Sequence, residues 1–184
     1  MARAGRQATP RDMVISLAVL LIPIVAITLF FTQRVPGPPV QVVDWKPVLA
    51  QAREQANFPI WAPTELPNGW RPTQVSWVQR GNPDLTGNPV PADRWQFGTL
   101  NAQDVYLGID EQAGGGADFV ATASRNGVAD GQSVIGANTW QRLVTNDRQQ
   151  TRSLVLTTKQ ATTVVSGDVP YDQLEAFVRT LTAS

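Results

Sequence analysis

The stretch WQFGTLNAQDVYLGI, residues 95–109, decides the fold expected for this chain. Bulky apolar side chains alternate with small or polar ones before and after a short polar break. Such a period of two is typical of β-strands that bury one face. The break itself, Asn101–Asp104, has the length and composition of a hairpin connection. The stretch therefore predicts two neighbouring antiparallel strands.

The same alternation recurs on both sides of this hairpin, and most of the connections are equally short. A first strand is expected near residues 73–79. After the hairpin, further strands are expected at 132–136, 138–145, 152–158 and 161–166. Strands joined by hairpin-length links pair antiparallel, so the pattern predicts one antiparallel sheet of about six or seven strands.

Helices are expected at both ends of this sheet. Asp44 can cap a helix over residues 45–56, and Pro170 suits the first turn of a helix that runs to about residue 182 with an apolar stripe. Residues 117–125 are expected to form a short helix, with a strand as the alternative. Helices at the ends of an antiparallel sheet define an α+β domain.

An irregular segment separates the first helix from the first strand. Four prolines within residues 58–72 block regular structure there. Trp61, Leu66 and Trp70 are too apolar to be left in water, so the segment is expected to act as a strap that closes one end of the core. No glycine fingerprint follows a strand and opens a helix, which disfavours a doubly wound nucleotide fold.

Before the sheet domain, the sequence MVISLAVLLIPIVAITLFF runs through residues 13–31 without a charge. As a helix it would span roughly 28 Å, close to the thickness of a bilayer's hydrocarbon core. Pro23 is tolerated in such a helix. A cleaved signal peptide and a buried core helix are the alternatives. No small-x-small cleavage site follows the segment, so an uncleaved transmembrane anchor is favoured.

The charges around the apolar segment predict its direction. Three arginines precede it and one follows it, so the N-terminus is expected in the cytoplasm. The predicted organisation is a cytoplasmic basic head at 1–12, a transmembrane helix at 13–31, a Pro/Gly linker at 32–41 and an extracytoplasmic domain at 42–184. The protein is therefore expected to be a single-pass protein of the cell membrane.

Composition excludes several chemistries. The chain holds no cysteine and no histidine, which removes disulfides, thiol catalysis, Ser-His-Asp triads and nearly every zinc site. The residues after position 34 carry 11 basic and 14 acidic side chains, a net charge of −3. Nucleic-acid binding through a basic patch is not expected. We predict no cofactor, no metal and no catalytic residue.

Three weaker patterns could indicate catalysis or phosphate binding. Asp110 and Glu111 are adjacent on a strand, so their side chains point to opposite faces, and a solvated loop edge is the favoured interpretation. The glycine run at 114–116 lacks the lysine and hydroxyl residue of a phosphate loop. A Ser-Lys dyad would need Lys46 or Lys159, and Lys159 falls in a polar turn.

Tryptophans are the remaining candidates for binding. The chain has six, and indole rings line ligand cavities as well as cores. Those on expected strands are favoured as core residues; if the sheet curved around a cavity, they would line it. The candidate ligand or partner contacts are Trp61, Trp70, Trp77, Trp95 and Trp140.

Several segments together resemble a known family. These are FPIWAP at 58–63, LPNGWRPT at 66–73 and GANTW at 136–140, after an N-terminal anchor and before a final helix. The chain resembles the actinobacterial domain-of-unknown-function family 4245, over nearly its whole length. The resemblance implies a single-pass envelope protein and supplies no activity. The order of elements is also similar to the Mog1/PsbP-like sandwich, and the strap to lipoprotein-carrier-like half-barrels, which are analogies of fold only.

Three functions follow as hypotheses. The first is a non-enzymatic, membrane-tethered module that binds a protein partner, another envelope protein, at the outer face of the membrane. The second is a lipid- or glycan-binding domain with a tryptophan-lined pocket. The third is an enzyme that uses carboxylates alone, which would need two of Asp104, Asp110, Glu111 and Asp118 in one cleft. The first is preferred.

Overall fold

The computed structural model describes residues 10–32, 41–84 and 86–184. Its chain divides into two compact units, residues 1–40 and 41–184, which are described separately. Residues 1–9 of the expected basic head and 33–40 of the expected linker lie outside the described part.

The described residues of the first unit form the helix α1 (Pro10–Thr32), with Pro23 inside it. The helix expected at 13–31 is therefore present. Thr28 donates its hydroxyl to the carbonyl oxygens of Ile24 and Val25, at 2.8 and 2.9 Å. Among the described residues, no helix meets the length and hydropathy required of a membrane span, so the transmembrane assignment is unconfirmed.

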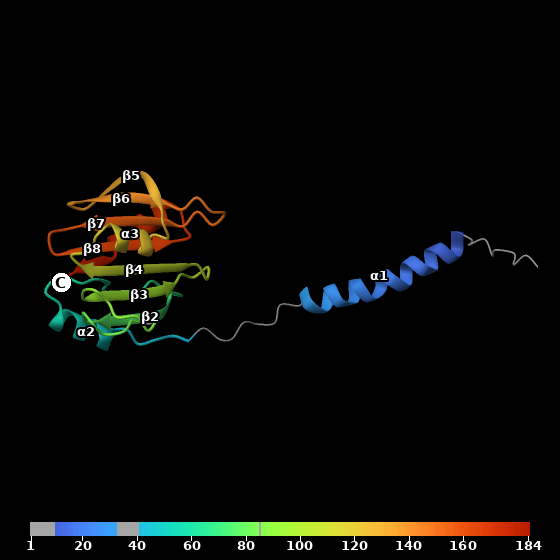
Figure 1. Cartoon of the computed structure of the whole chain (residues 1–184), viewed down its shortest axis with the longest axis horizontal. Coiled ribbons are helices and arrows are strands. Elements are labelled where there is room, and N and C mark those ends of the chain that lie inside the picture. The colour runs from blue at the N-terminus through green and yellow to red at the C-terminus, as the bar shows by residue number, and fades with distance from the viewer. Residues whose placement is uncertain (1–9, 33–40, 85) are drawn as a thin grey trace, which may run out of the picture. The chain divides into compact units, whose positions relative to one another are not determined.

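The second unit is built on an antiparallel sheet, which confirms the α+β prediction. Within the described residues this sheet has seven strands in the order β2-β3-β4-β8-β7-β6-β5 (Figure 1). Every pair is antiparallel. The strands are β2 (Arg71–Val78), β3 (Arg94–Leu100), β4 (Tyr106–Ala113), β5 (Val128–Ile135), β6 (Asn138–Val144), β7 (Arg152–Thr157) and β8 (Ala161–Gly167).

Three helices accompany the sheet: α2 (Lys46–Gln55), α3 (Ala117–Ala123) and α4 (Tyr171–Arg179). All three fall where the sequence predicts helices. Asp44 accepts a hydrogen bond from the Lys46 backbone N–H at 3.2 Å, close to the expected cap. The last helix is shorter than expected, because the chain leaves it after Arg179 and forms β9 (Leu181–Ala183).

A second, two-stranded sheet corrects the picture of an irregular strap. Residues Trp61–Pro63 of the strap form β1, which pairs antiparallel with β9. The pairing satisfies backbone groups that both irregular segments would otherwise bury. Ile60 extends it, since its N–H donates to the Ser184 carbonyl oxygen at 3.0 Å.

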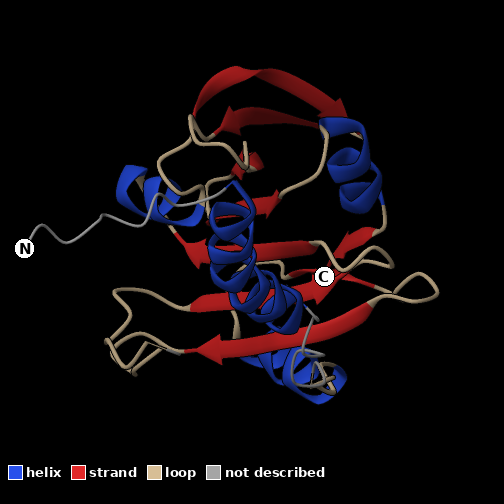
Figure 2. Ribbon diagram, turned by 90° about the vertical axis from the view of Figure 1, so that its right-hand side faces the viewer, coloured by secondary structure: helices blue, strands red, loops and turns tan. Residues whose placement is uncertain are grey.

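The strand β5 also differs from expectation. The sequence predicts this strand only from residue 132, yet the strand begins at Val128. The reason is a register shift between Ala129 and Gln132, where Gly131 adopts a φ of 91°. This bulge absorbs the turn-like residues within one strand. The twist of the β5–β6 pair is visible at the top of Figure 2.

The main core lies on one face of the sheet, here called the inner face. Side chains from α2, the strap and α4 pack there against alternate strand residues, including Trp95, Trp140 and Leu154, each 0% exposed. A smaller cluster lies on the opposite, outer face, where Phe119 of α3 packs against strand residues. Figure 1 shows α3 in front of the sheet. The outer face is therefore only partly covered.

Candidate functional site

The strand β5 is one of the two edge strands of the seven-stranded sheet. In the described part of the chain, no strand pairs with its outer side. A two-residue turn joins β5 to β6, with Gly136 at a φ of 61° in its first position. Such a turn is closed by a hydrogen-bonded pair, here Ile135 and Asn138. Hydrogen bonding then alternates along the ladder.

This alternation fixes which backbone groups of β5 face outward. Ser133 and Ile135 bond to β6, so the N–H and C=O groups of Gln132 and Val134 point away from the sheet. The Val134 side chain is 73% exposed. We define the β5 edge as the backbone of Gln132 and Val134 together with the Val134 side chain. It presents hydrogen-bonding groups and an apolar side chain at one place.

A polar network holds β5 against α4. Arg142 donates to Ser133 Oγ and to Glu175 Oε1, both at 2.6 Å, and Ser133 Oγ donates to the same Glu175 oxygen at 2.7 Å. These hydrogen bonds, that of Ser133 first and then that of Arg142, lower the pKa of Glu175. Arg179 adds an ion pair to Glu175 at 3.2 Å. This network therefore fixes β5 against α4.

The opposite edge, at β2, is better covered. The Val43 N–H donates to the Pro72 carbonyl oxygen at 2.9 Å, and Trp77 Nε1 donates to Gln55 Oε1 of α2 at 2.8 Å. Figure 1 shows α2 beside β2. The two edges of the sheet therefore differ in accessibility, and β5 is the open one.

The five candidate tryptophans lie on the inner side of the domain. Trp95 and Trp140 are fully buried, and the other three are half-buried against the core. Trp61 meets Trp140 edge to face, with ring centroids 5.6 Å apart, and Trp70 lies 5.4 Å from Phe177. In the described part of the chain they all belong to one hydrophobic core.

One cavity does touch two of them. Trp61 and Trp140 line a space of about 230 Å³ between the β5–β6 turn and the end of α4. Within the described residues, Trp140 Nε1 is buried and has no hydrogen-bond partner. Neither Trp70, Trp77 nor Trp95 lines this cavity. The tryptophan contacts stay a prediction.

The carboxylates of the hypothetical cleft are dispersed. Asp110 lies on the outer face, where Arg94 donates to it at 2.8 Å and Gln96 at 2.7 Å. Glu111 lies on the inner face and is 1% exposed. Asp104 pairs with Arg71 at the β3–β4 turn, and Asp118 lies in the first turn of α3. The opposite orientation of Asp110 and Glu111 is confirmed.

The interpretation of Glu111 as part of a solvated edge was wrong. Its two carboxyl oxygens accept hydrogen bonds from the Trp61 N–H at 3.0 Å and the Thr163 hydroxyl at 2.9 Å. Burial raises its pKa to about 7, against the lowering effect of these two bonds. Glu111 faces inward opposite Thr163 of β8. Because this strand pairing is not known from the sequence, no sequence signal could have identified the buried carboxyl.

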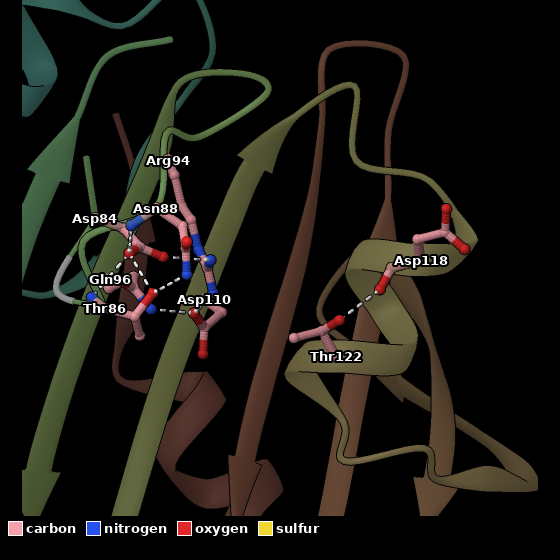
Figure 3. A network of polar contacts seen from close by, with 8 residues as sticks. All are labelled: Asp84, Thr86, Asn88, Arg94, Gln96, Asp110, Asp118 and Thr122. Atoms are coloured by element: carbon pink, nitrogen blue, oxygen red, sulfur yellow. Dashed lines mark hydrogen bonds and ion pairs between the residues drawn. The ribbon is translucent and has the colours of Figure 1, made fainter. Parts of the chain in front are cut away.

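A second polar network on the outer face was missed at the level of sequence. Asp84 accepts hydrogen bonds from Thr86 and Asn88 within the 80–92 loop and lies 3.9 Å from the Arg94 guanidinium. Its pKa is lowered chiefly by the Thr86 hydroxyl. Figure 3 shows this loop network beside β3 and β4, with α3 farther to the right. Among the described residues, no group of acidic side chains is placed to hold a metal ion.

Comparison with known proteins identifies the family. Residues 6–181 match the family described as "Protein of unknown function (DUF4245)". The expected resemblance is therefore confirmed over nearly the whole chain. No curated protein sequence matches this chain.

One solved structure shows a distant likeness. It is the Pseudomonas aeruginosa MucA/MucB complex, at 15% sequence identity and a TM-score of 0.34. The alignment covers 67% of this chain and only 35% of that chain. No function is taken from a likeness at this level.

Proposed function

We propose that this chain, which belongs to the DUF4245 family, is a non-enzymatic module that binds a protein partner at the outer face of the cell membrane. The residues at 13–31 would tether it there, with the N-terminus in the cytoplasm and residues 42–184 outside. The proposed partner is another envelope protein that contributes an extended segment.

The β5 edge is the observation that carries this proposal. An extended peptide can add a strand to an open sheet edge, gaining affinity from backbone hydrogen bonds and specificity from alternate side chains. Gln132 and Val134 offer the outward backbone groups, and Val134 offers an apolar contact. An edge of this kind is an aggregation hazard that proteins usually cover or charge. Its retention here supports a binding role.

The tether is supported by sequence and local structure. Residues 13–31 are uncharged and lie within the continuous helix α1. Three arginines precede them, which favours retention of the N-terminus in the cytoplasm. Because the chain has no natural cysteine, a single cysteine at Lys159 would report its side of the membrane. Labelling of intact cells by an impermeant thiol reagent is expected, and labelling only after lysis would overturn the proposed orientation.

Dispersal of the carboxylates supports a non-enzymatic role. A hydrolase that uses two carboxylates needs them on either side of one bond, about 5–10 Å apart. Asp110 and Glu111 instead lie on opposite faces of β4, and each is held by neighbours in the fold.

The alternative of a tryptophan-lined pocket for a lipid or glycan has one supporting observation, the cavity beside Trp61 and Trp140. At about 230 Å³ it is smaller than the ligand sites of ~300–1,000 Å³ common in proteins. We therefore place this function second. For the finer fold, α3 on the outer face and α4 on the inner face support the sandwich type over the half-barrel.

Partner capture with an edge-blocked variant tests the proposal. The full-length chain, wild type or Val134→Pro, is purified from mildly solubilised membranes of its own host. Proline removes the outward N–H of residue 134 without removing a bond to β6. A protein that accompanies the wild type and is lost from the variant is expected. Equal recovery with both chains would show that the β5 edge is not the docking site.

A further inference from the structure

A cavity of about 430 Å³ lies on the outer face, between α3 and the strands β3 and β4. Its floor includes Arg94 and Gln112, which are direct neighbours across the β3–β4 pair. Phe119 and Thr122 of α3 form part of its wall. Figure 3 shows Thr122 projecting from α3 on the side of the strands. The volume falls within the range of ~300–1,000 Å³ that is typical of small-ligand sites.

The wall is held close to the floor by the glycine run before α3. The Thr162 hydroxyl donates to the Gly115 carbonyl oxygen at 2.6 Å. A Cβ atom at Gly115 would lie 2.7 Å from the Phe119 ring, so only glycine permits this approach. The position of α3, and with it the shape of the cavity, therefore depends on glycine at position 115.

Hydrogen-bonding groups in the cavity are left unused. Gln112 is only 9% exposed, and no residue in the described part of the chain bonds to its side-chain amide. The Nε–H of Arg94 is also buried without a partner among the described residues. Buried polar groups are nearly always satisfied by protein, water or ligand. The Gln112 amide is thus free to bond to something that enters the cavity, whereas the Nε–H of Arg94 is covered on all sides and is not.

The charge of the surroundings selects the ligand. Arg94 is already paired with Asp110 at 2.8 Å and lies 3.9 Å from Asp84, while Asp118 adds a further carboxylate to the lining. Carboxylates thus outnumber the single guanidinium, which disfavours an anion such as phosphate. A cation is disfavoured in turn, because the Arg94 guanidinium lies in the cavity floor and two of the carboxylates already face it. The ligand should therefore be neutral.

The hydrogen-bonding character of the ligand follows from the donors and acceptors that line the cavity. The Gln112 amide offers donors and an acceptor. Thr122 donates its own proton to the Asp118 carbonyl oxygen at 2.9 Å, so its hydroxyl oxygen is left to accept. A ligand that both donates and accepts at each position matches this set, and hydroxyl groups do so. Pro91 and Phe119 supply apolar surface for the carbon skeleton.

We propose that this cavity, here called the Gln112 pocket, binds a neutral saccharide unit through its hydroxyl groups. The site goes beyond the proposed partner binding. It lies on β3, β4 and α3, whereas the β5 edge is at the far end of the strand order. Saccharide binding should therefore be independent of partner binding.

Binding of free sugars to the full-length chain tests the inference. The protein is held in a phosphocholine detergent, because glycoside detergents would themselves present sugars. Neutral pentoses, hexoses, N-acetylhexosamines and their disaccharides are screened by saturation-transfer NMR, with spermidine as a cationic probe. Inorganic phosphate, the anionic probe, is followed by the broadening of its phosphorus-31 signal. At least one saccharide should bind, and phosphate should not.

Two matched substitutions locate the site. Gln112→Leu removes the free amide at similar volume and is expected to weaken saccharide binding about tenfold. Gln74→Leu makes the same change at a half-buried outer-face position on β2 and should leave it unaltered. Thermal unfolding checks that both variants are folded. Failure of every saccharide to bind, equal binding by the Gln112→Leu chain, or binding of spermidine alone would overturn the inference. Since Val134→Pro leaves the Gln112 pocket intact, loss of partner capture does not bear on it.

Discussion

The carboxyl group of Glu111 accepts a hydrogen bond from the backbone N–H of Trp61 at 3.0 Å, although the two residues lie 50 positions apart. Trp61 belongs to the strap, and its carbonyl oxygen accepts a bond from Trp95 Nε1 at 3.1 Å. Glu111 itself is held by Thr163 at 2.9 Å. One buried carboxyl therefore ties the strap to two central strands of the sheet.

This carboxyl should make folding stability depend on pH. Burial raises the pKa of Glu111 from 4.5 to about 7. Between these values the folded chain keeps a proton that the unfolded chain has lost, so stability should fall as the pH rises through this range. The loss should be on the order of 3 kcal/mol. Chemical denaturation at a series of pH values measures it.

The variant Glu111→Gln supplies the control for this prediction. Its amide oxygen can accept from the Trp61 N–H while its amino group donates to the Thr163 hydroxyl oxygen. The variant should keep the strap in place and lose the fall in stability from pH 4.5 to about 7. A fall as steep as that of the wild type would show that another group titrates.

Glu175 should have the opposite pH dependence. Its pKa is lowered by the bonds from Ser133 and Arg142. A lowered pKa stabilises the fold above the carboxyl's ordinary value of 4.5, and this contribution is lost as the pH falls through the folded value. Glu175→Gln should therefore destabilise the domain by about 1–2 kcal/mol at neutral pH. The difference from wild type should shrink under acid, as followed by chemical denaturation; a constant difference would contradict this.

The glycine run before α3 predicts that alanine substitutions at two neighbouring glycines differ in their cost to stability. In Gly115→Ala, the new methyl group would meet the Phe119 ring at 2.7 Å. Overpacking of this kind typically costs about 1–3 kcal/mol. At Gly116 nothing lies within 4 Å of an added Cβ, so Gly116→Ala should cost much less. Unfolding free energies of the two variants measure the contrast, and equal costs would show that α3 can move away.

Proline substitutions on β5 test which backbone groups face outward. Val134→Pro should leave the melting temperature nearly unchanged, because its N–H makes no bond to β6. Ser133→Pro removes a ladder bond and the contact with Glu175, and should cost about 3 kcal/mol or more. Thermal unfolding of the full-length variants distinguishes them. A reversed order would place Ser133 on the outward side.

Alternation of side chains made the sheet predictable from sequence. Each strand of the seven-strand sheet overlaps an expected segment, and the hairpin at 95–109 forms β3 and β4 as expected. The last residues of the chain were not predictable, because β9 forms only by pairing with the distant strap. The first half of β5 was likewise not predictable, because the bulge at Gly131 lies among turn-forming residues.

The sites were much less predictable. The exposure of Val134 depends on β5 being the last strand of the sheet, and hairpin patterns do not give the order of strands. Gln112 has no local signal either, since its free amide results from the position of α3 over β4. The chemistry of the indole ring made the tryptophans candidates for ligand binding, yet the hydrophobic effect places Trp95 and Trp140 in the core.

Site-specific photocrosslinking in living cells tests the central claim most directly. A photoreactive residue at Val134 of the full-length chain should crosslink to an extended segment of another envelope protein, identified by mass spectrometry of the linked peptides. The same residue at Glu54, exposed on α2, should not capture that protein. A product at both positions, a product only between two copies of this chain, or none at Val134 would contradict the account.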